Sequence, residues 1–256
     1  MIKDNNKAKN DLARLLMSNA YNVERLQPSL NDAAYLHLLD LRDALMSYST
    51  NDSIRVLDFG CGGSPYKIMF PNSEYMRADF MHCEGLDFLL SEDSTLPCPD
   101  EEFNLILSTQ VLEHVPEPSH YIKECFRVLK PGGHLLLTTH GLFQEHGCPH
   151  DFYRWTAEGL CRLVEQCGGF EIIDIKKLTC GPRAICTLLN QSIGSARTVK
   201  FSLFAAGLKL ARATWRIFPA WLNRCAEKHW KCYAIKNGLA SDDTLYIALM
   251  IYAKRI

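Results

Sequence analysis

Short apolar runs of strand length alternate with stretches of helical periodicity along most of the chain. The runs are rich in Val, Ile, Leu and Phe, and they predict strands over residues 54–59, 74–79, 85–89, 103–108, 134–139, 170–175 and 244–251. Most of them are separated by segments in which apolar residues recur every three or four positions. This alternation indicates repeated β-α units, and therefore an α/β fold with a mostly parallel sheet covered by helices on both faces.

The two ends of the chain depart from this alternation. Residues 10–49 have helical spacing interrupted at Pro28, and residues 182–238 form a long insertion before the last predicted strand. We therefore divide the 256 residues into an N-terminal helical cap (1–50), an α/β core (51–181), a helical insertion (182–240) and the final core strand (241–256).

Composition and charge exclude several classes of protein. The 28 Lys and Arg against 29 Asp and Glu give a net charge of -1, so bulk charge does not make the chain a polyanion binder. Eleven cysteines, an odd number without a repeated CxxC pair, indicate free thiols in a reducing compartment. The polar N-terminus predicts no secretory signal, and no run reaches the ~20 apolar residues needed to cross a bilayer. We expect a cytoplasmic protein.

A glycine turn follows the first predicted strand. In the sequence DFGCGG, Asp58 ends the strand, and Gly60 and Gly62 leave the backbone open to a ligand. Asp79 ends the second strand 21 residues later, where a carboxylate can accept both hydroxyls of a ribose. Because the turn lacks a phosphate-binding Lys and the third glycine of GxGxxG, the pattern favours a nucleoside without pyrophosphate, such as S-adenosylmethionine.

Four sequence blocks, VLDFGCG, YMRADF, LPCPDEEFNLILSTQVLEHV and FRVLKPGGHLLLTT, occur in the order found in one enzyme family. They resemble the successive motifs of class I S-adenosylmethionine-dependent methyltransferases. The likeness extends through FYRWTAEGLCRLVEQCGGFEI, and the terminal LYIALMIYAKR is similar to the final, antiparallel strand of that family. The resemblance implies a Rossmann-like fold with a seven-stranded sheet that is parallel except for its last strand.

The same resemblance implies a role for each motif residue in binding the cofactor S-adenosylmethionine. The residues expected around its methionine part are Asp58, Phe59, Gly60 and Gly62. Asp79 would hold the ribose, and Phe80 would lie against the adenine, whose amino group would meet Glu92 or the adjacent Asp93. Thr109 and Gln110 would flank the sulfonium end.

Polar residues are dense after the fourth and fifth strands, where the methyl acceptor would lie. His150 beside Asp151 suits acid-base catalysis, because a carboxylate orients an imidazole and stabilises its charged form. His114, in VLEHV, and His140 are the further candidates for a base, although Glu113 and His114 are also suited to fixing their loop.

The remaining polar residues after the fifth strand are predicted to bind the acceptor: His146, Tyr153 and Arg154. Arg154 suits either a substrate phosphate or a structural pair with an acid. A metal held by His146, Cys148 and His150 is disfavoured, because alternating one-residue spacing is unusual for such sites. We expect no metal.

The segments CGGSPYKIMFP and EHGCPHDFYRWT are similar to segments of bacterial methyltransferases found with surface-polysaccharide and glycolipid genes. This likeness implies O-methylation of a glycan or lipid-linked sugar. A soluble small-molecule acceptor and a non-enzymatic binding module that kept the fold are the alternatives. Nucleic acid is disfavoured, because Thr-Gln-Val-Leu stands where a base-flipping tetrapeptide would follow the fourth strand.

The helical insertion is strongly basic. Between Pro182 and Gly238, ten Lys or Arg face one acid, a formal charge of +9, and three of the four tryptophans lie there. Lys209, Arg212 and Arg216 share one face of a predicted helix. Such a helix suits peripheral contact with an anionic membrane, or a lid whose charges are solvated; the pattern leaves both open, as it does the oligomeric state.

Overall fold

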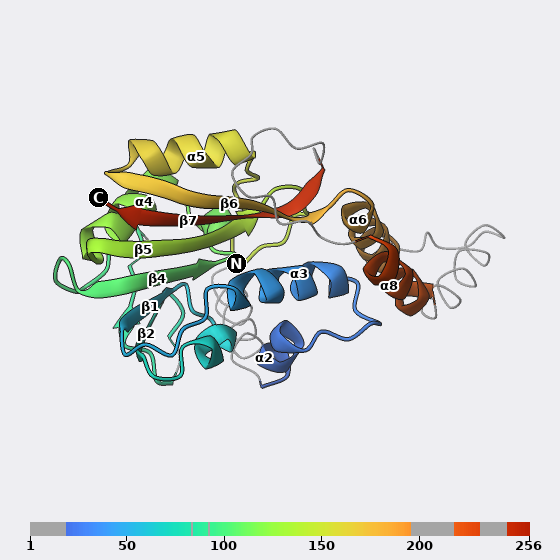
Figure 1. The fold of residues 1–256 in the computed structure, drawn as a ribbon, viewed down its shortest axis with the longest axis horizontal. Helices are drawn as coiled ribbons and strands as arrows, with labels where there is room; N and C mark the ends of the chain where they lie inside the picture. Colours follow the sequence, from blue (N-terminus) through green and yellow to red (C-terminus); the bar gives the residue numbers. More distant parts are fainter. Residues whose placement is uncertain (1–18, 83, 92, 196–217, 231–244) are drawn as a thin grey trace, which may run out of the picture.

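The computed structural model describes residues 19–82, 84–91, 93–195, 218–230 and 245–256. Its centre is a seven-stranded sheet in the order β3-β2-β1-β4-β5-β7-β6 (Figure 1). The strands are β1 (Arg55–Phe59), β2 (Glu74–Asp79), β3 (Phe88–Leu89), β4 (Phe103–Thr109), β5 (Leu129–His140), β6 (Phe170–Cys180) and β7 (Tyr246–Arg255). Each of the seven predicted strands is present, although β3 has two residues and β5, β6 and β7 run further than their apolar runs suggested.

The strand directions confirm the predicted topology. Strands β1 to β5 pair in parallel, whereas β7 pairs antiparallel with β5 on one side and with β6 on the other. The fold is therefore a Rossmann-like α/β fold with a mostly parallel sheet and an antiparallel last strand. In such a sheet ligands bind at the carboxyl ends of the parallel strands.

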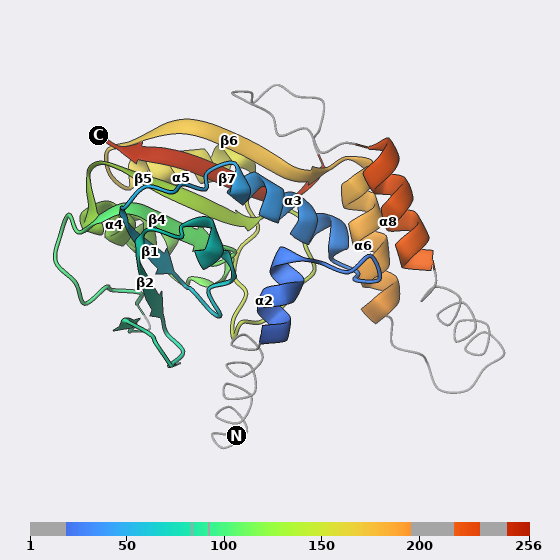
Figure 2. The same ribbon diagram turned by 60° about the horizontal axis from the view of Figure 1, so that its bottom comes forward.

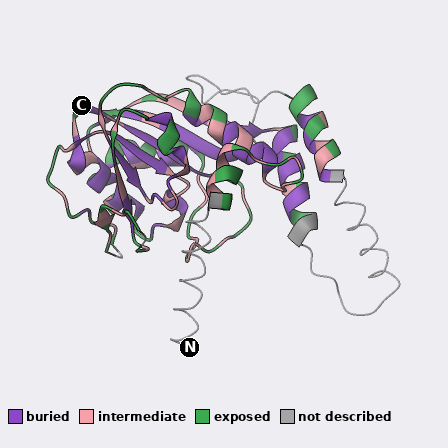
Figure 3. Cartoon of the chain, turned by 90° about the horizontal axis from the view of Figure 1, so that it is seen from below, coloured by how far each residue is buried: buried purple, intermediate pink, exposed green. Residues whose placement is uncertain are grey.

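Alternating side chains give the sheet two apolar faces. In β4, Ile106 joins one core, whereas Leu105 and Leu107 join the other. The first core is completed by α4 (Pro118–Val128) and α5 (Ala157–Gln166), and the second by α3 (Tyr35–Met46) with the short η1 (Pro65–Met69). Because both faces are covered, the central strands β1, β4, β5 and β7 read as apolar runs and are buried along most of their length (Figure 3).

The helical N-terminal segment and the insertion, far apart in sequence, pack together. Helix α2 (Asn19–Leu26) precedes α3, and α6 (Pro182–Ser195) and α8 (Phe218–His229) lie side by side against α3 beyond the end of the sheet (Figure 2). Tyr35 and Leu36 of α3 share an apolar cluster with Cys186 and Ala226.

A buried ion pair adds to this contact, since the Arg183 guanidinium binds the carboxylate of Asp40 on α3. Breaking such a pair leaves an uncompensated buried charge, which is strongly destabilising. The N-terminal cap and the insertion are separate stretches of the sequence. In the structure, α3 of the cap packs with α6 and α8 of the insertion as one layer.

Further predictions from the sequence concern the cysteines, membrane-spanning helices and the basic face of the insertion. The nine cysteines in the described part of the chain are all free. None of the helices built from described residues is both long and apolar enough to span a membrane. The predicted basic face formed by Lys209, Arg212 and Arg216 lies outside the described residues, as does Trp215.

Candidate functional site

A cavity of about 650 Å³ opens at the carboxyl ends of β1, β2, β4 and β5. One part is walled by the turn after β1 and the end of β2, and another by the loops after β4 and β5, with α2 and α3 closing a side. The predicted site residues that line it are Phe59, Gly60, Gly62, Asp79, Phe80, Thr109, Gln110, His114, His140, His146 and His150. Residues assigned to the cofactor and to the acceptor thus share one cavity.

The glycine turn has a backbone conformation that side chains disfavour. Gly60 has a φ of +80° and its amide donates to the Ala78 carbonyl, 2.8 Å away. A Cβ added at Gly60 would lie 2.5 Å from a methyl carbon of Val111, whereas one at Gly62, with φ +48°, would meet nothing within 4 Å. Gly60 is therefore required by packing, and Gly62 faces open space.

Asp79 is fixed by backbone amides at the edge of this turn. The Gly62 amide donates to its Oδ2 at 2.8 Å, and the Met81 amide donates to its Oδ1 at 2.9 Å. The Phe80 amide is a third donor to this carboxylate. Burial raises the pKa of Asp79, although the amide hydrogen bonds oppose the shift.

Asp58 lies behind the turn and does not line the cavity. It is 2% exposed, and the Tyr75 hydroxyl donates to its Oδ2 at 2.7 Å. Burial raises the pKa of Asp58 to about 7. The predicted direct contact with the methionine part is therefore replaced by a supporting position beneath the glycine turn.

The other residues assigned to the cofactor divide into two groups. Phe80 is 41% exposed at the cavity, and Gln110, with φ +56°, is held by hydrogen bonds from its amide and side chain to Thr138. The Oε1 of Gln110 is buried without a hydrogen-bond partner. Asp93 is outside the cavity lining, where it accepts from Ser91 Oγ at 2.5 Å.

The position of Asp93 has a local cause, since this carboxylate closes a turn by accepting also from the Thr95 amide at 3.0 Å. These hydrogen bonds lower the pKa of Asp93 to about 2. Asp93 therefore lies outside the lining of the cavity in which the adenine is expected, although its neighbours Ser91 and Ser94 line it. The alternative acid, Glu92, lies outside the described residues.

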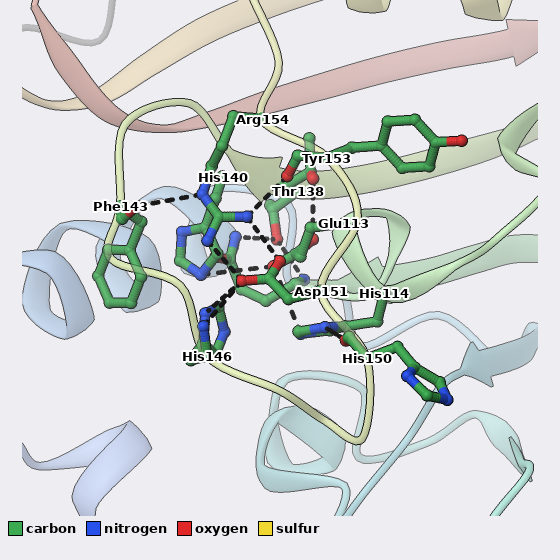
Figure 4. Close-up of polar contacts among 12 residues, drawn as sticks. Glu113, His114, Thr138, His140, Phe143, His146, His150, Asp151, Tyr153 and Arg154 are labelled. Carbon is green, nitrogen blue, oxygen red and sulfur yellow. Dashed lines mark hydrogen bonds and ion pairs between the residues drawn. The ribbon is translucent and has the colours of Figure 1, made fainter.

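A buried carboxylate, Glu113, organises the loops after β4 and β5 (Figure 4). The Thr139 hydroxyl donates to its Oε2 at 2.8 Å, and its backbone carbonyl accepts from the Phe152 amide at 2.8 Å. Its Oε1 is 3.4 Å from His140 Nε2 and 4.0 Å from His114 Nε2. Burial raises the pKa of Glu113 to about 7.

The imidazoles of His114 and His146 meet edge to face beside this carboxylate, with ring centroids 4.9 Å apart (Figure 4). His114 Nδ1 donates to the His150 carbonyl at 2.6 Å, so its Nε2 keeps a lone pair. Burial lowers the pKa of both His114 and His146. Both rings are therefore neutral near pH 7.

Two further histidines, His37 and His140, line the cavity beside the ring of Phe143. His140 stacks on Phe143 at 4.1 Å, and His37 of α3 lies 5.3 Å from His140 between ring centroids. Burial lowers the pKa of His37 to about 3 and that of His140 well below its usual range. The Nδ1 atoms of both rings are buried without a hydrogen-bond partner.

The predicted pair of His150 and Asp151 is not formed. Asp151 accepts from both terminal nitrogens of Arg154, at 2.6 Å each, and from the His146 amide at 2.8 Å. The exposed imidazole of His150 points away from Asp151 and packs near Phe152 (Figure 4). In this extended loop, neighbouring residues point in different directions, so adjacency in sequence did not become contact.

Arg154 and Tyr153 are also occupied by structural contacts. The guanidinium of Arg154 bonds Asp151 and the carbonyls of Phe143, Gln144 and Tyr153, which uses all five of its N–H donors. These hydrogen bonds lower the pKa of Asp151 to about 2.

The Tyr153 hydroxyl donates to the Pro116 carbonyl at 3.1 Å, and neither Tyr153 nor Arg154 lines the cavity. Of the two readings of Arg154, a substrate phosphate or a structural pair, the geometry favours the structural pair. Among the three residues predicted to bind the acceptor, only His146 reaches the cavity.

A family model for a methyltransferase domain matches residues 32–172, more than half of the chain. The protein belongs to this methyltransferase family. The match covers the glycine turn, Asp79 and the acceptor-side loops, and it ends inside β6.

Curated relatives of this methyltransferase domain match a shorter stretch. A phthiotriol/phenolphthiotriol dimycocerosates methyltransferase of Mycobacterium ulcerans is 34% identical over 99 residues, which are 33% of this chain and 36% of the relative. A ubiquinone biosynthesis O-methyltransferase of Parvibaculum lavamentivorans is 26% identical over 103 residues, 34% of this chain and 41% of the relative. The matches thus span about two fifths of the length of these relatives.

Solved structures share the fold over most of the methyltransferase chain. A SAM-dependent methyltransferase of Thermotoga maritima covers 95% of this chain with a TM-score of 0.56 and 15% identity, over 98% of its own length. The [4+2]-cyclase SpnF covers 88% of this chain with a TM-score of 0.52 and 21% identity, over 84% of its own length. At these identities the likeness establishes the fold alone.

The structure adds site residues that the sequence did not single out. Tyr21 and Arg25 of α2 and His37 of α3 line the cavity of this methyltransferase domain. The spacing of apolar residues predicts the helices that carry these side chains. It does not indicate which face of each helix meets a ligand. Glu113 was read as a loop-fixing residue, and the signal for its burial among histidines was the VLEHV block that also carries His114.

Proposed function

We propose that the protein transfers a methyl group from S-adenosylmethionine to an oxygen of an acceptor held beside the histidine cluster. One observation carries this proposal: a single cavity is lined by the glycine turn with Asp79 and by His114 and His146. Holding both reactants in line within one site supplies much of the acceleration of a bimolecular transfer.

The residues present fit S-adenosylmethionine. The open space beside Gly62 admits a ligand against the backbone, and the carboxylate of Asp79 at the same cavity suits two ribose hydroxyls. The unpartnered Oε1 of Gln110 and the nearby Thr109 lie where the sulfonium end is expected. When bound, this cofactor supplies an electrophilic methyl group.

The acceptor side of the cavity suits removal of a proton from a hydroxyl. Glu113, His114 and His146 place a carboxylate and two neutral imidazoles beside one another, and neutral imidazole nitrogens are effective bases near pH 7. His140 contributes a buried ring to the same wall. We assign the task to this cluster rather than to the predicted pair of His150 and Asp151.

For the acceptor we propose a glycan or a lipid-linked sugar. The sequence likeness to the surface-polysaccharide branch supports this class, and a relative named for O-methylation in ubiquinone biosynthesis supports an oxygen as the methylated atom. A soluble metabolite remains the alternative class.

Labelled S-adenosylmethionine tests both levels of the proposal. The purified protein is incubated with the labelled cofactor and cell extract, which is then separated into lipid, glycan and small-molecule pools. Label in the lipid or glycan pool is expected; label only in the small-molecule pool would favour the soluble acceptor. Calorimetry without acceptor measures binding of S-adenosylmethionine. A protein that does not bind this cofactor would favour the non-enzymatic binding module.

We also propose that the insertion docks the enzyme on an anionic membrane surface. Four apolar side chains on α6, on α8 and directly after α8 are each more than 40% exposed: Ile185, Leu189, Trp221 and Trp230. Amphipathic aromatic rings together with an excess of basic charge suit the headgroup region of an anionic bilayer. Docking there would bring the cavity to lipid-linked acceptors.

Co-sedimentation with vesicles tests the docking. Binding to phosphatidylglycerol vesicles should exceed binding to phosphatidylcholine vesicles and should weaken with salt. Changing Lys209, Arg212 and Arg216 together to Gln should reduce binding. Three exposed basic residues elsewhere, Lys67, Lys123 and Arg162, changed to Gln give a control with the same loss of charge. If both variants lose vesicle binding equally, or if the wild type does not bind vesicles, the insertion is a lid and not a membrane-docking element.

A further inference from the structure

Three side chains from two separate loops meet at the acceptor side of the cavity. Glu113 and His114 belong to the short helix η2 (Leu112–His114) after β4, and His146 belongs to the loop after β5. Their carboxylate oxygen and imidazole nitrogens all lie within 4.8 Å of one another. His114 and His146 line the cavity, and Glu113 is fully buried beside them.

The carboxylate of Glu113 has one satisfied and one unsatisfied oxygen. Its Oε2 accepts from Thr139, whereas its Oε1 is buried and has no hydrogen-bond partner among the described residues. The nearest nitrogens to Oε1 are His140 Nε2 at 3.4 Å and His114 Nε2 at 4.0 Å. A buried acceptor without a partner costs free energy unless a ligand satisfies it. The unsatisfied oxygen is therefore an indication of a missing positive partner, independent of the clustering itself.

Both imidazoles are oriented from behind. The His150 carbonyl fixes Nδ1 of His114 as a donor, which leaves Nε2 as a lone pair directed at the cluster. Nδ1 of His146 lies 3.3 Å from the Gln144 carbonyl and 3.5 Å from Asp151 Oδ2, which favours the same tautomer. Metal-binding histidines are commonly held in this way by a carbonyl or carboxylate on the other nitrogen.

We propose that Glu113, His114 and His146 form a divalent-cation site that opens onto the cavity and holds an oxygen of the acceptor. The proposal rests on the function above and changes the role of the cluster in it, because a nitrogen that binds an ion cannot also accept a proton. The ion would instead lower the pKa of the bound acceptor hydroxyl, whose proton would pass to solvent. Two imidazoles and one carboxylate are a donor set for catalytic zinc and for other first-row metals, whereas magnesium and calcium prefer oxygen ligands. Three protein ligands leave a coordination position for the acceptor.

The distances permit such a site after small side-chain movements. In a tetrahedral site, metal-ligand bonds of about 2.0 to 2.2 Å place neighbouring ligand atoms roughly 3.3 to 3.6 Å apart. The present separations, at most 4.8 Å, therefore need to close by about 1.5 Å or less. This site differs from the set of His146, Cys148 and His150 considered from sequence, because the His150 ring points away from it (Figure 4).

Metal binding can be measured without cofactor or acceptor. The full-length protein is stripped with a chelator and titrated with Zn²⁺ by calorimetry, and bound metal is counted by mass spectrometry after gel filtration. One ion per chain is expected for the wild type. Glu113→Gln and His146→Ala should each weaken Zn²⁺ binding at least ~100-fold, because each removes one of only three protein ligands.

Two variants serve as matched controls. His150→Ala retains the backbone carbonyl that orients His114, and Cys148→Ser removes the thiol of the other candidate set; both should bind Zn²⁺ like the wild type. Because His146 lies on a partly exposed loop, its Ala variant should fold even where Glu113→Gln does not. Wild-type affinity in His146→Ala, or a loss in Cys148→Ser, would overturn the assignment.

The proposal and the methyl-transfer function fail in different ways. Stripped protein should still bind S-adenosylmethionine, but should lose methyl transfer that Zn²⁺ or Mn²⁺ restores. Full transfer by stripped protein would overturn the cation site and leave the methyltransferase function intact. Conversely, the variants could change Zn²⁺ binding as expected in a protein that does not bind S-adenosylmethionine. That result would support the cation site and overturn the methyltransferase function.

Discussion

The two ends of the cavity are built in different ways. The cofactor end comes from short local sequences: a glycine turn directly after β1, and Asp79, whose carboxylate is fixed by amides of that turn and of the next residues. The acceptor end joins the loops after β4 and β5 with α2 and α3. Backbone geometry determines the first end, whereas long-range side-chain contacts determine the second. The first should therefore control affinity, and the second turnover.

The largest effect is expected at the acceptor end. His114→Ala should lower kcat roughly 100-fold or more, because it removes the nitrogen that faces both Glu113 and the cavity. Its affinity for S-adenosylmethionine, measured by calorimetry, should stay within about threefold of the wild type. His150→Ala is the matched control, and its kcat should be nearly normal. A larger loss in His150→Ala would restore the catalytic role predicted from its neighbour Asp151.

The converse pattern is expected at the cofactor end. Asp79→Ala should weaken S-adenosylmethionine binding by about 1 to 3 kcal/mol, since two hydroxyls lose a charged acceptor. Asp93→Ala removes an exposed acid outside the cavity and should leave the affinity unchanged. Calorimetry on both variants decides the point: equal affinities would reject the ribose assignment of Asp79.

Several features of this comparison were predictable from sequence. All seven strands and the place of Asp79 follow from local patterns, because strand periodicity and turn glycines are set by neighbouring residues. The antiparallel direction of β7 was instead implied by the resemblance of its sequence to the last strand of the family. The partner of Asp151 was not predictable, because its carboxylate binds the guanidinium of Arg154, three residues further on, and not the neighbouring His150. The contact of Arg183 with Asp40 was also missed, because 143 residues separate the partners.

The two glycines of the turn offer a finer test of backbone control. Gly60→Ala should destabilise the protein by about 1 to 3 kcal/mol, because a positive φ and a clash with Val111 act together. Gly62→Ala should cost only about 1 kcal/mol, from φ alone, since its Cβ meets open space. Thermal unfolding of both variants gives the comparison. Equal losses would mean that the clash with Val111 is relieved by movement of the turn.

The effect expected from Asp58, beneath the turn, depends on pH. Burial raises its folded pKa to about 7 from 3.8, so between these values the folded state holds a proton that the unfolded state has released. Stability should therefore fall as pH rises through this window, by at most about 1.4 kcal/mol per pH unit. Asp58→Asn cannot ionise.

Urea unfolding at pH 5 and pH 7 measures this difference in the absence of cofactor. Relative to the wild type, Asp58→Asn should gain stability from the lower to the higher pH, because only the wild-type side chain acquires a buried charge. A difference between the two proteins that is independent of pH would place the proton elsewhere.

The position of β7 between β5 and β6 has a consequence for synthesis on the ribosome. Among the described strands, β6 pairs only with β7, and residues 181–245 are translated between them. At about 5 to 20 residues per second, β6 and the outer edge of β5 wait roughly 3 to 13 s for their neighbour. During that interval the nascent chain presents two open strand edges, which makes it a client for chaperones and favours aggregation whenever translation stalls in the insertion.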